Sequence, residues 1–288
     1  MNETTTQTGR ILLPDDRYLN LDRTLVMGIL NVTPDSFSDG GMFFEPDQAV
    51  QYALEMIAQG ADIIDIGGES SRPGSEPVEM EEELKRVLPV IRAVRESTRI
   101  PISIDTTKGE VAREALRAGA NIINDISALR SDPEMAEVAA TYKAPVVLMH
   151  MLGTPRTMQL EPRYQDCIKE IRQFFSERIH HCHNYGIDKA QIIIDPGIGF
   201  GKRLEDNLEI IRRLEDFAMF DCPLMLGTSR KSFISMITKD KQNPENRIGG
   251  SLASAVLAIL KGINILRVHD VAATVEAIKV VRAIEGTG

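Results

Sequence analysis

The sequence predicts a single-domain (β/α)8 barrel of the TIM type over residues 23–288, preceded by a short N-terminal extension over residues 1–22. Eight short apolar runs alternate with helical patterns along the chain, which is the order of a barrel with eight strand–helix units. Several runs are continuously apolar, as strands buried on both faces require. An open doubly wound sheet shows the same alternation, but the eight units and the absence of a GxGxxG motif after the first run favour the barrel.

The predicted strands are rich in Ile, Leu, Val and Met, and the run from Ile192 to Ile194 has no polar interruption. Such short apolar runs between turn residues are typical of buried parallel strands. The strands are expected at residues 25–30, 62–66, 100–104, 121–126, 145–149, 191–194, 223–226 and 263–268.

The intervening helices are predicted from apolar residues spaced three and four positions apart. One such stripe runs from Met80 to Val94, and another runs from Tyr164 to Tyr185 and ends at Gly186. Asp270 is expected to cap the last helix, whose apolar stripe begins at Val271. The sequence shows no internal repeat and no linker after the extension, which favours one domain.

The composition is that of a globular protein with an acidic surface. Apolar residues make up 43% of the chain and charged residues 26%, which excludes general disorder. A net charge of −9 argues against a partner such as nucleic acid or an anionic membrane, because both need a basic face. An anionic small substrate would need a local cluster of Arg, Lys and His.

Three well-separated cysteines without a CxxC pair predict reduced thiols and a cytoplasmic protein. The longest apolar run near the C-terminus, residues 252–260, is shorter than the ~20 residues that span a bilayer. The N-terminal residues lack the apolar core of a signal peptide. No membrane partner is therefore expected.

A polar or charged residue ends almost every predicted strand. In a barrel these ends converge on one face, where catalytic groups lie. Asp and Asn also cap turns and helices, but capping does not account for a whole ring of such residues. The ring consists of Asn31, Asp65, Asp105, Asn124 with Asp125, His150, Asp195, residues 229–231 and residues 267–269.

Two of the loops at these strand ends are long and rich in Gly, Pro and Ser. The first, residues 31–41, reads Asn-Val-Thr-Pro-Asp-Ser-Phe-Ser-Asp-Gly-Gly, and the second, residues 67–75, reads Gly-Gly-Glu-Ser-Ser-Arg-Pro-Gly-Ser. Long loops at the catalytic end are typically lids or binding loops. Phe37 among polar residues and Arg72 among small ones favour binding loops over merely solvated ones.

These loops resemble the two signatures of the dihydropteroate synthase family, the second of which begins at Asp65. Ser71 stands where the family usually has Thr, so the hydroxyl is kept and a methyl group is lost. Further similar motifs follow in the family's order: Ser-Ile-Asp-Thr at 103–106, Asn-Asp at 124–125, Asp-Pro-Gly-Ile-Gly-Phe-Gly at 195–201, Gly-Thr-Ser-Arg-Lys-Ser at 227–232 and Arg-Val-His at 267–269.

The resemblance implies an enzyme of folate synthesis that joins p-aminobenzoate to 6-hydroxymethyl-7,8-dihydropterin pyrophosphate, giving 7,8-dihydropteroate and pyrophosphate. The edge of a pterin is a row of hydrogen-bond donors and acceptors, and buried carboxylates and amides need such partners. By resemblance, the pterin would meet Asp105, Asn124, Asp195 and Lys231, with Met149 and Phe200 as apolar walls.

Pyrophosphate is the leaving group, and the resemblance places Asn31, Arg72, Arg267 and His269 around it. Arg267 can bind a phosphate group through two nitrogens, and His269 adds another donor. The helix that begins near Asp270 directs backbone N–H groups to the same place. Mg²⁺ is the implied cofactor. It keeps several waters and bridges diphosphate oxygens, so the amide oxygen of Asn31 suffices as its protein ligand.

The resemblance further implies a dissociative substitution at the pterin methylene, with Asp35 offsetting the cation that forms there. Sulfonamides would compete with p-aminobenzoate, and barrel helices would form a homodimer. The catalytic residues would be Asp35, Lys231, Arg267 and His269, and the p-aminobenzoate pocket would consist of Phe37, Ser71, Arg72, Pro73 and Ser229.

Two alternative functions are weighed against this one. A pterin-dependent methyltransferase shares the barrel and the pterin carboxylates, but it does not need several cations aimed at a diphosphate. A non-catalytic pterin-binding protein would keep Asp105, Asn124 and Asp195 and lose the two loops. His150 is either a support for the site or a core residue, and the sequence leaves this open. The cluster at residues 180–183 resembles a metal site, but charge–dipole placement at a helix end is favoured.

Overall fold

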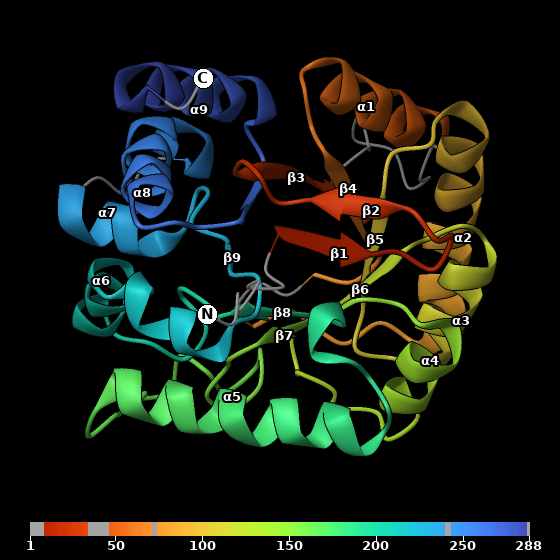
Figure 1. The fold of residues 1–288 in the computed structure, drawn as a ribbon, viewed down its shortest axis with the longest axis horizontal. Coiled ribbons are helices and arrows are strands. Elements are labelled where there is room, and N and C mark those ends of the chain that lie inside the picture. The colour runs from red at the N-terminus through yellow and green to blue at the C-terminus, as the bar shows by residue number, and fades with distance from the viewer. Residues whose placement is uncertain (1–8, 34–45, 71–73, 240–242, 287–288) are drawn as a thin grey trace, which may run out of the picture.

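The computed structural model describes residues 9–33, 46–70, 74–239 and 243–286, and the predicted barrel lies at its centre (Figure 1). The strands are parallel and follow one another in the order β8-β7-β6-β5-β4-β3-β10-β9. A parallel bridge between Ile194 and Leu224 brings the two edges of the sheet together. The strands are β3 (Leu25–Asn31), β4 (Ile63–Gly67), β5 (Ile102–Asp105), β6 (Ile122–Asp125), β7 (Val146–Met149), β8 (Ile192–Asp195), β9 (Met225–Leu226) and β10 (Ile265–Val268).

All eight predicted strands are confirmed, with ends that differ by one or two residues. Seven of the strands begin one or two residues later than expected, and in three of them, β5, β7 and β9, a proline lies one or two residues before the strand. Proline has no N–H to donate, but its carbonyl still accepts a hydrogen bond from the neighbouring strand. The bonds run from Ile64 N to Pro101 O (3.1 Å), from Ile123 N to Pro145 O (2.9 Å) and from Ile194 N to Pro223 O (2.9 Å).

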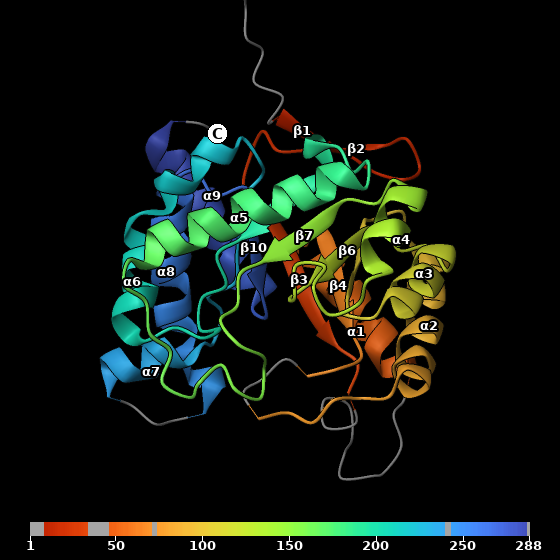
Figure 2. The same ribbon diagram turned by 90° about the horizontal axis from the view of Figure 1, so that it is seen from below.

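Helices surround the strands and cover their outer faces (Figures 1 and 2). A large apolar cluster fills the space between strands and helices, and residues such as Val26, Leu30 and Ile64 belong to it. The helices are α1 (Pro46–Ala58), α2 (Met80–Ser97), α3 (Gly109–Arg117), α4 (Met135–Tyr142), α5 (Cys167–Asn184), α6 (Leu204–Arg212), α7 (Ser232–Thr238), α8 (Ile248–Leu260) and α9 (Val271–Glu285), with short 3₁₀ helices η2 (Lys189–Gln191), η3 (Leu214–Phe220) and η4 (Pro244–Arg247). In the part of the chain that the structure describes, no helix is long and apolar enough to cross a membrane.

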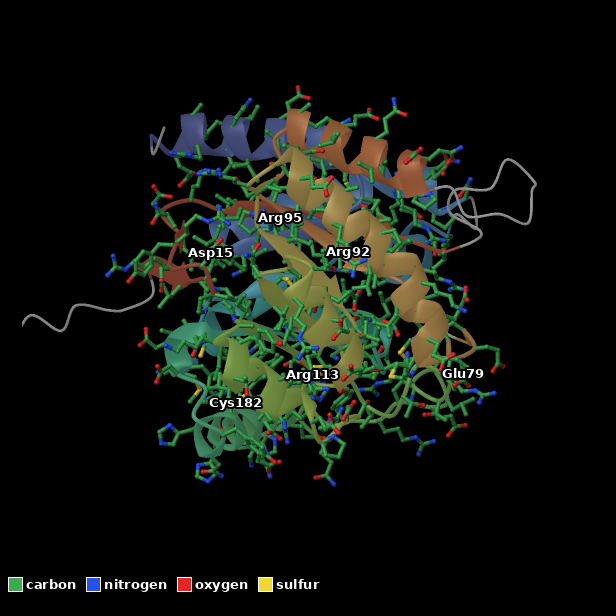
Figure 3. The ribbon with its side chains drawn as sticks, turned by 90° about the vertical axis from the view of Figure 1, so that its right-hand side faces the viewer. Asp15, Glu79, Arg92, Arg95, Arg113 and Cys182 are labelled. Carbon is green, nitrogen blue, oxygen red and sulfur yellow. The ribbon has the colours of Figure 1, made fainter. Side chains whose placement is uncertain are left out.

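Figure 3 shows α2, α3 and α4 side by side along one flank of the barrel, with Arg95 near the end of α2. Arg95 donates from Nε to the Gly119 carbonyl (3.0 Å) and from Nη2 to Oδ1 of Asn121 (2.7 Å). The same Asn121 oxygen accepts a bond from the backbone N–H of Ile102 (3.1 Å). Asn121 therefore joins a helix to the start of β5, and β6 begins one residue after it.

One helix end agrees with the sequence prediction and one helix start does not. Gly186 follows α5 with a left-handed φ of +79°, and its N–H donates to the His183 carbonyl (3.0 Å). Asp270 lies at the N-cap position of α9, but its carboxylate makes no capping bond and instead accepts two bonds from Arg230 (2.6 and 3.0 Å). The predicted side-chain cap was wrong, because an arginine 40 positions earlier in the chain takes both carboxylate oxygens.

Within residues 1–22, an antiparallel hairpin of β1 (Arg10–Leu12) and β2 (Tyr18–Asn20) lies across the amino-terminal end of the barrel (Figure 2). Ile11 and Leu19 belong to one apolar cluster with inward residues from the first half of the strands, such as Met27 and Ile193. The hairpin therefore closes the end of the barrel opposite the predicted site.

We expect Ile11→Ala to lower the free energy of unfolding by about 2–4 kcal/mol, because Ile11 is fully buried in the interior cluster. Denaturant unfolding of the variant and of Arg10→Ala, which changes an exposed neighbour, measures the effect. Equal stability of the two variants would contradict a packed role for the hairpin.

Candidate active site

Alternation along the strands decides which side chains enter the barrel. In β3, Leu25 and Met27 belong to the interior cluster, whereas Val26 and Leu30 pack against the helices. The same period places Asn31, the last residue of β3, on the inner side at the carboxyl end. In five other strands the last side chain that points inward is also polar, with Gly67 following Asp65 in β4. These residues are Asp65, Asp105, Asn124, Asp195 and Arg267.

Arg267 connects two of these strands across the mouth of the barrel. Its Nε donates to Oδ2 of Asp65 (2.6 Å) and its Nη2 donates to Oδ2 of Asp105 (2.6 Å). Asn124 donates from Nδ2 to the same Asp65 oxygen (3.1 Å). Side chains from β4, β5, β6 and β10 thus form one network, which confirms that the predicted strand ends converge.

Burial controls the charge of this network. Burial raises the pKa of Asp105, and neighbouring Arg267 partly offsets this effect. Burial acts to lower the pKa of Arg267, but Asp65 and Asp105 outweigh it and raise that pKa above its ordinary value. Among the described residues, the buried Oδ1 of Asp65 has no hydrogen-bond partner. The network therefore contains more acceptor capacity than its own donors use, which suits a ligand that brings donors.

Asp125 is an exception in the predicted ring, because its position in β6 turns it away from the barrel interior. Its carboxylate accepts bonds from the backbone N–H groups of Ser127 (2.7 Å) and Leu129 (2.8 Å). Asp125 therefore caps the turn after β6, and its inclusion in the ring was wrong.

Asp195 begins a tight turn of three glycines at the end of β8. Its Oδ1 accepts a bond from the Gly197 N–H (2.7 Å), and burial raises its pKa. Gly197, Gly199 and Gly201 all have left-handed φ angles, of +69°, +82° and +65°. A Cβ on Gly197 would lie 2.1 Å from the His150 carbonyl oxygen, so only glycine fits there. The turn is thereby pressed against the chain that follows β7.

Lys231, at the start of α7, lies over this turn. Its Nζ donates to the Ile198 carbonyl and lies 4.2 Å from the centroid of the Phe200 ring. Burial lowers its pKa to about 8, although neighbouring Asp195 acts in the opposite direction. Met149 is buried in a small cluster against which Phe200 packs. The structure therefore brings together the predicted pterin contacts Asp195, Lys231, Met149 and Phe200.

Ser229 and His269 lie side by side at the ends of β9 and β10. The Ser229 hydroxyl is 3.1 Å from Nδ1 of His269 and 3.2 Å from its backbone N–H. Ser229, which the resemblance assigns to p-aminobenzoate, therefore contacts a predicted pyrophosphate residue and orients its imidazole.

Asn31, the expected Mg²⁺ ligand, lies at the carboxyl end of the barrel with the other polar residues of the site. Asn31 offers one amide oxygen at the end of β3, which pairs with β10, the strand that carries Arg267. Within the described ranges, no group of three or more His, Cys, Asp or Glu residues is arranged to hold a metal ion. A Mg²⁺ ion there would depend on the substrate's phosphate oxygens and on water, as expected for this cation.

Asp35, Phe37, Ser71, Arg72 and Pro73 lie outside the described residues. The structure does describe the start of the second loop. Charged residues that the sequence did not single out hold it in place. Arg86 donates to the Gly68 carbonyl (2.9 Å), and Lys108 bridges Glu69 and the fully buried Glu83. A small pocket beside Asp105 is lined in part by both glutamates. Lys108 lies three residues after Asp105, a predicted site residue at the end of β5. This position close to the Ser-Ile-Asp-Thr motif was the sequence feature that could have identified it.

The fold and the site define an α/β barrel enzyme that binds a polar ring at the carboxyl ends of its strands. The model of a family described as "Pterin binding enzyme" matches residues 27–269. A dihydropteroate synthase of a Synechocystis strain is 51% identical over 262 residues, which cover 91% of this chain and 90% of the relative. The chain belongs to the dihydropteroate synthase family.

Solved structures agree with this assignment. The dihydropteroate synthase of Xanthomonas albilineans with 4-aminobenzoic acid has a TM-score of 0.91 at 45% identity, with 97% of this chain and 99% of that chain covered. A structure from the same organism in complex with 7,8-dihydropteroate has a TM-score of 0.87 at 44% identity, with 97% and 100% covered. These relatives favour neither the methyltransferase nor the non-catalytic alternative.

Proposed function

We propose that this protein condenses 6-hydroxymethyl-7,8-dihydropterin pyrophosphate with p-aminobenzoate, releasing 7,8-dihydropteroate and pyrophosphate for folate synthesis. The observation that carries the proposal is the hydrogen-bond network at the carboxyl ends of the strands, which is formed by Arg267, Asp65, Asp105 and Asn124. Relatives of the same family, similar over nine-tenths of the chain, support the same reaction.

The pterin edge is assigned to the inward residues of β5, β6 and β8. Asp195 accepts from the exocyclic amine and a ring N–H, and Asn124 both donates and accepts. Lys231 donates to a ring acceptor, for which it exchanges the Ile198 carbonyl that it contacts in the structure. Met149 and Phe200 pack on the ring, and Asp105 completes the polar edge.

The diphosphate is assigned to the side of the mouth formed by β3 and β10. Arg267 binds it through its guanidinium, and His269, oriented by Ser229, donates a second bond. Arg72 adds charge from the second loop. Asn31 would hold Mg²⁺, which when bound would supply further positive charge beside the diphosphate.

The substitution is dissociative. The C–O bond at the pterin methylene breaks first, with its electron pair leaving on the diphosphate, and the positive charge spreads into the pterin ring, where Asp35 offsets it. Arg267 and His269 stabilise the leaving charge. The amine of p-aminobenzoate, held by Phe37, Ser71, Pro73 and Ser229, then attacks the methylene and loses a proton to solvent. It is already a nucleophile and needs no strong base.

The test is pyrophosphate release by the purified chain with both substrates and Mg²⁺, followed by identification of dihydropteroate in the products. Release with both substrates, and none when either is omitted, is expected. Methyl transfer to or from the pterin, without pyrophosphate release, would overturn the proposal. Sulfonamides are expected to inhibit competitively with p-aminobenzoate.

We expect Asn31→Ala to raise the Mg²⁺ concentration needed for half-maximal turnover about tenfold, since the ion loses its protein oxygen. Pterin affinity, measured by calorimetry without Mg²⁺, should stay unchanged. Full activity of the variant at low Mg²⁺ would show that Asn31 is not the ligand.

The quaternary structure is proposed to be a homodimer through α7, α8 and α9, which lie next to one another on one side of the barrel (Figure 1). Each of these helices carries large apolar side chains that are more than half exposed, and soluble monomers rarely expose such patches. The side chains are Met236, Ile237, Leu257, Leu260, Val280 and Ile284.

We expect Leu257→Glu to convert the dimer into a monomer, as measured by sedimentation velocity at micromolar concentration, because it places a charge on α8, which lies between α7 and α9 (Figure 1). Leu160→Glu, at an exposed leucine outside these helices, is the control and should leave the mass unchanged. A monomeric wild-type protein would contradict the proposed dimer.

The cytoplasm is the proposed compartment. Cys167, Cys182 and Cys222 are free and buried, and burial raises the pKa of each thiol. Such thiols stay reduced in a reducing environment.

A further inference from the structure

The described structure contains a buried lysine that the proposed reaction does not use. Lys202 follows the glycine turn, and only 4% of its surface is exposed. Its Nζ lies 3.0 Å from Nδ1 of His150, 3.2 Å from the His150 carbonyl and 3.0 Å from the Phe200 carbonyl. Among the described residues it forms no ion pair with a carboxylate. Its three polar partners therefore come from two segments, the end of β7 and the turn after β8.

These two segments supply the walls of the pterin site. Met149 precedes His150, and Asp195 and Phe200 flank the turn. Gly197 and Gly201 allow the turn to lie tightly on the first segment, because a Cβ on either would come within 2.5 Å of the His150 or Leu152 carbonyl oxygen. Lys202 contacts carbonyls of both segments from a buried position. Gln159 and Tyr164, further along the chain after β7, also donate to the turn, at the Gly199 carbonyl (2.9 Å) and the Gly201 carbonyl (2.8 Å).

A second lysine binds the same turn from another direction. Lys231 donates to the Ile198 carbonyl and lies over the Phe200 ring, while Lys202 donates to the Phe200 carbonyl. The left-handed glycines leave these carbonyls free to accept from side chains. The Phe200 ring and the resting position of Lys231 therefore depend on a turn that Lys202 helps to hold.

The surroundings of Lys202 make its protonated form less favourable than in water, as its pKa shows. Burial lowers its pKa to about 7, and Lys231 also lowers it, whereas Cys167, Asp195 and Asp206 raise it. Burial, Lys202 and Arg130 keep the pKa of His150 well below its ordinary value, so His150 is neutral and its Nδ1 can accept from the ammonium. A methionine would fill the same space without this cost, so packing alone does not account for a lysine.

We propose that Lys202 is a positioning residue for the pterin site, whose ammonium holds the glycine turn against the end of β7 and so fixes Phe200 and Lys231 for the pterin. This inference rests on the proposed pterin site. It assigns His150 to the same task, as the neutral acceptor that orients the ammonium.

The decisive variant is Lys202→Met, which keeps the length of the side chain and removes its charge. Its matched control is Arg203→Met, at the next residue, which is partly exposed and pairs with Asp206. We expect Lys202→Met to weaken the binding of 6-hydroxymethylpterin about tenfold by calorimetry, while the KM for p-aminobenzoate at saturating pterin stays within twofold. Lys202→Arg should recover part of the lost affinity.

Proton uptake on pterin binding distinguishes a role of the Lys202 charge in pterin binding from a role in stabilising the fold. If the protonated ammonium favours pterin binding, binding must in turn favour protonation, so the wild type should take up protons when it binds pterin between pH 7 and 8. Calorimetry in buffers of different ionisation enthalpy measures this uptake. It should be smaller in Lys202→Met and unchanged in Arg203→Met.

Wild-type pterin affinity and proton uptake in Lys202→Met would overturn the inference while leaving the proposed function intact. An equal loss for both substrates together with a lowered unfolding midpoint would show a structural role only. If Lys202→Met does not fold, Lys202→Arg decides. Its guanidinium stays protonated, so it should take up fewer protons on pterin binding than the wild type, and equal uptake would overturn the inference. Failure of the wild type to release pyrophosphate would instead refute the proposed function.

Discussion

Asp195→Asn is expected to lower kcat/KM for the pterin substrate by about 30- to 1000-fold, equivalent to about 2–4 kcal/mol. The asparagine can still accept the bond from the Gly197 N–H, so the turn is kept. It cannot accept from two pterin donors with a charged carboxylate, which leaves a buried donor without a partner. Steady-state kinetics at saturating p-aminobenzoate measure the loss.

The pH profile of the same variant provides an independent check. Burial raises the pKa of Asp195, so in the wild type the carboxylate gains a proton as the pH falls and can then no longer accept both bonds. The acidic limb of kcat/KM that Asp195 causes should disappear in Asp195→Asn. Asp188→Asn, before the amino end of the same strand, is the control and should keep the wild-type profile. An unchanged specificity constant for the pterin substrate would remove Asp195 from the site.

Arg267→Lys is expected to lower kcat/KM by about 100-fold or more although the positive charge is kept. Arg267 uses two different nitrogens for Asp65 and Asp105, and a single ammonium cannot reproduce this geometry or bind a phosphate through two nitrogens. The control is Arg23→Lys, which changes an exposed pair in which Arg23 also bonds both oxygens of one aspartate, Asp62. Its kinetics should match the wild type, so comparable losses in the two variants would contradict a special role for Arg267.

Removing the charge in Arg267→Met should also change stability with pH. Without the guanidinium, the pKa of Asp105 rises further above its unfolded value, since burial then acts unopposed by its main cation. The native state then holds a proton that the unfolded state has lost, so stability falls as the pH rises from the unfolded pKa of Asp toward the native one. Unfolding midpoints from pH 4 to 8 should show a steeper fall in Arg267→Met than in the wild type.

The sequence by itself determined the barrel and the residues at its mouth. Continuous apolar runs are typical of parallel strands covered on both faces, and eight strand–helix units without a GxGxxG motif favoured the barrel over an open sheet. The carboxyl ends of barrel strands converge on one face, so the polar residues there, Asp105, Asn124, Asp195 and Arg267, were expected to meet. The three glycines after Asp195 adopt left-handed φ angles, which few other residues do, so the sequence also favours a tight turn there.

Tertiary structure decided how the charges pair, since pairing depends on side chains that are distant in sequence. Asp270 was a good N-cap by local rules, but Arg230 takes both its oxygens. Asp125 shares the strand end with Asn124, but the pleat turns it outward to cap a turn. His150 is buried, and its ring contacts Lys202, a residue 52 positions later in the chain. Local sequence preferences act over one turn of chain, whereas the Asp270–Arg230 and His150–Lys202 contacts are made by elements that only the closed barrel brings together.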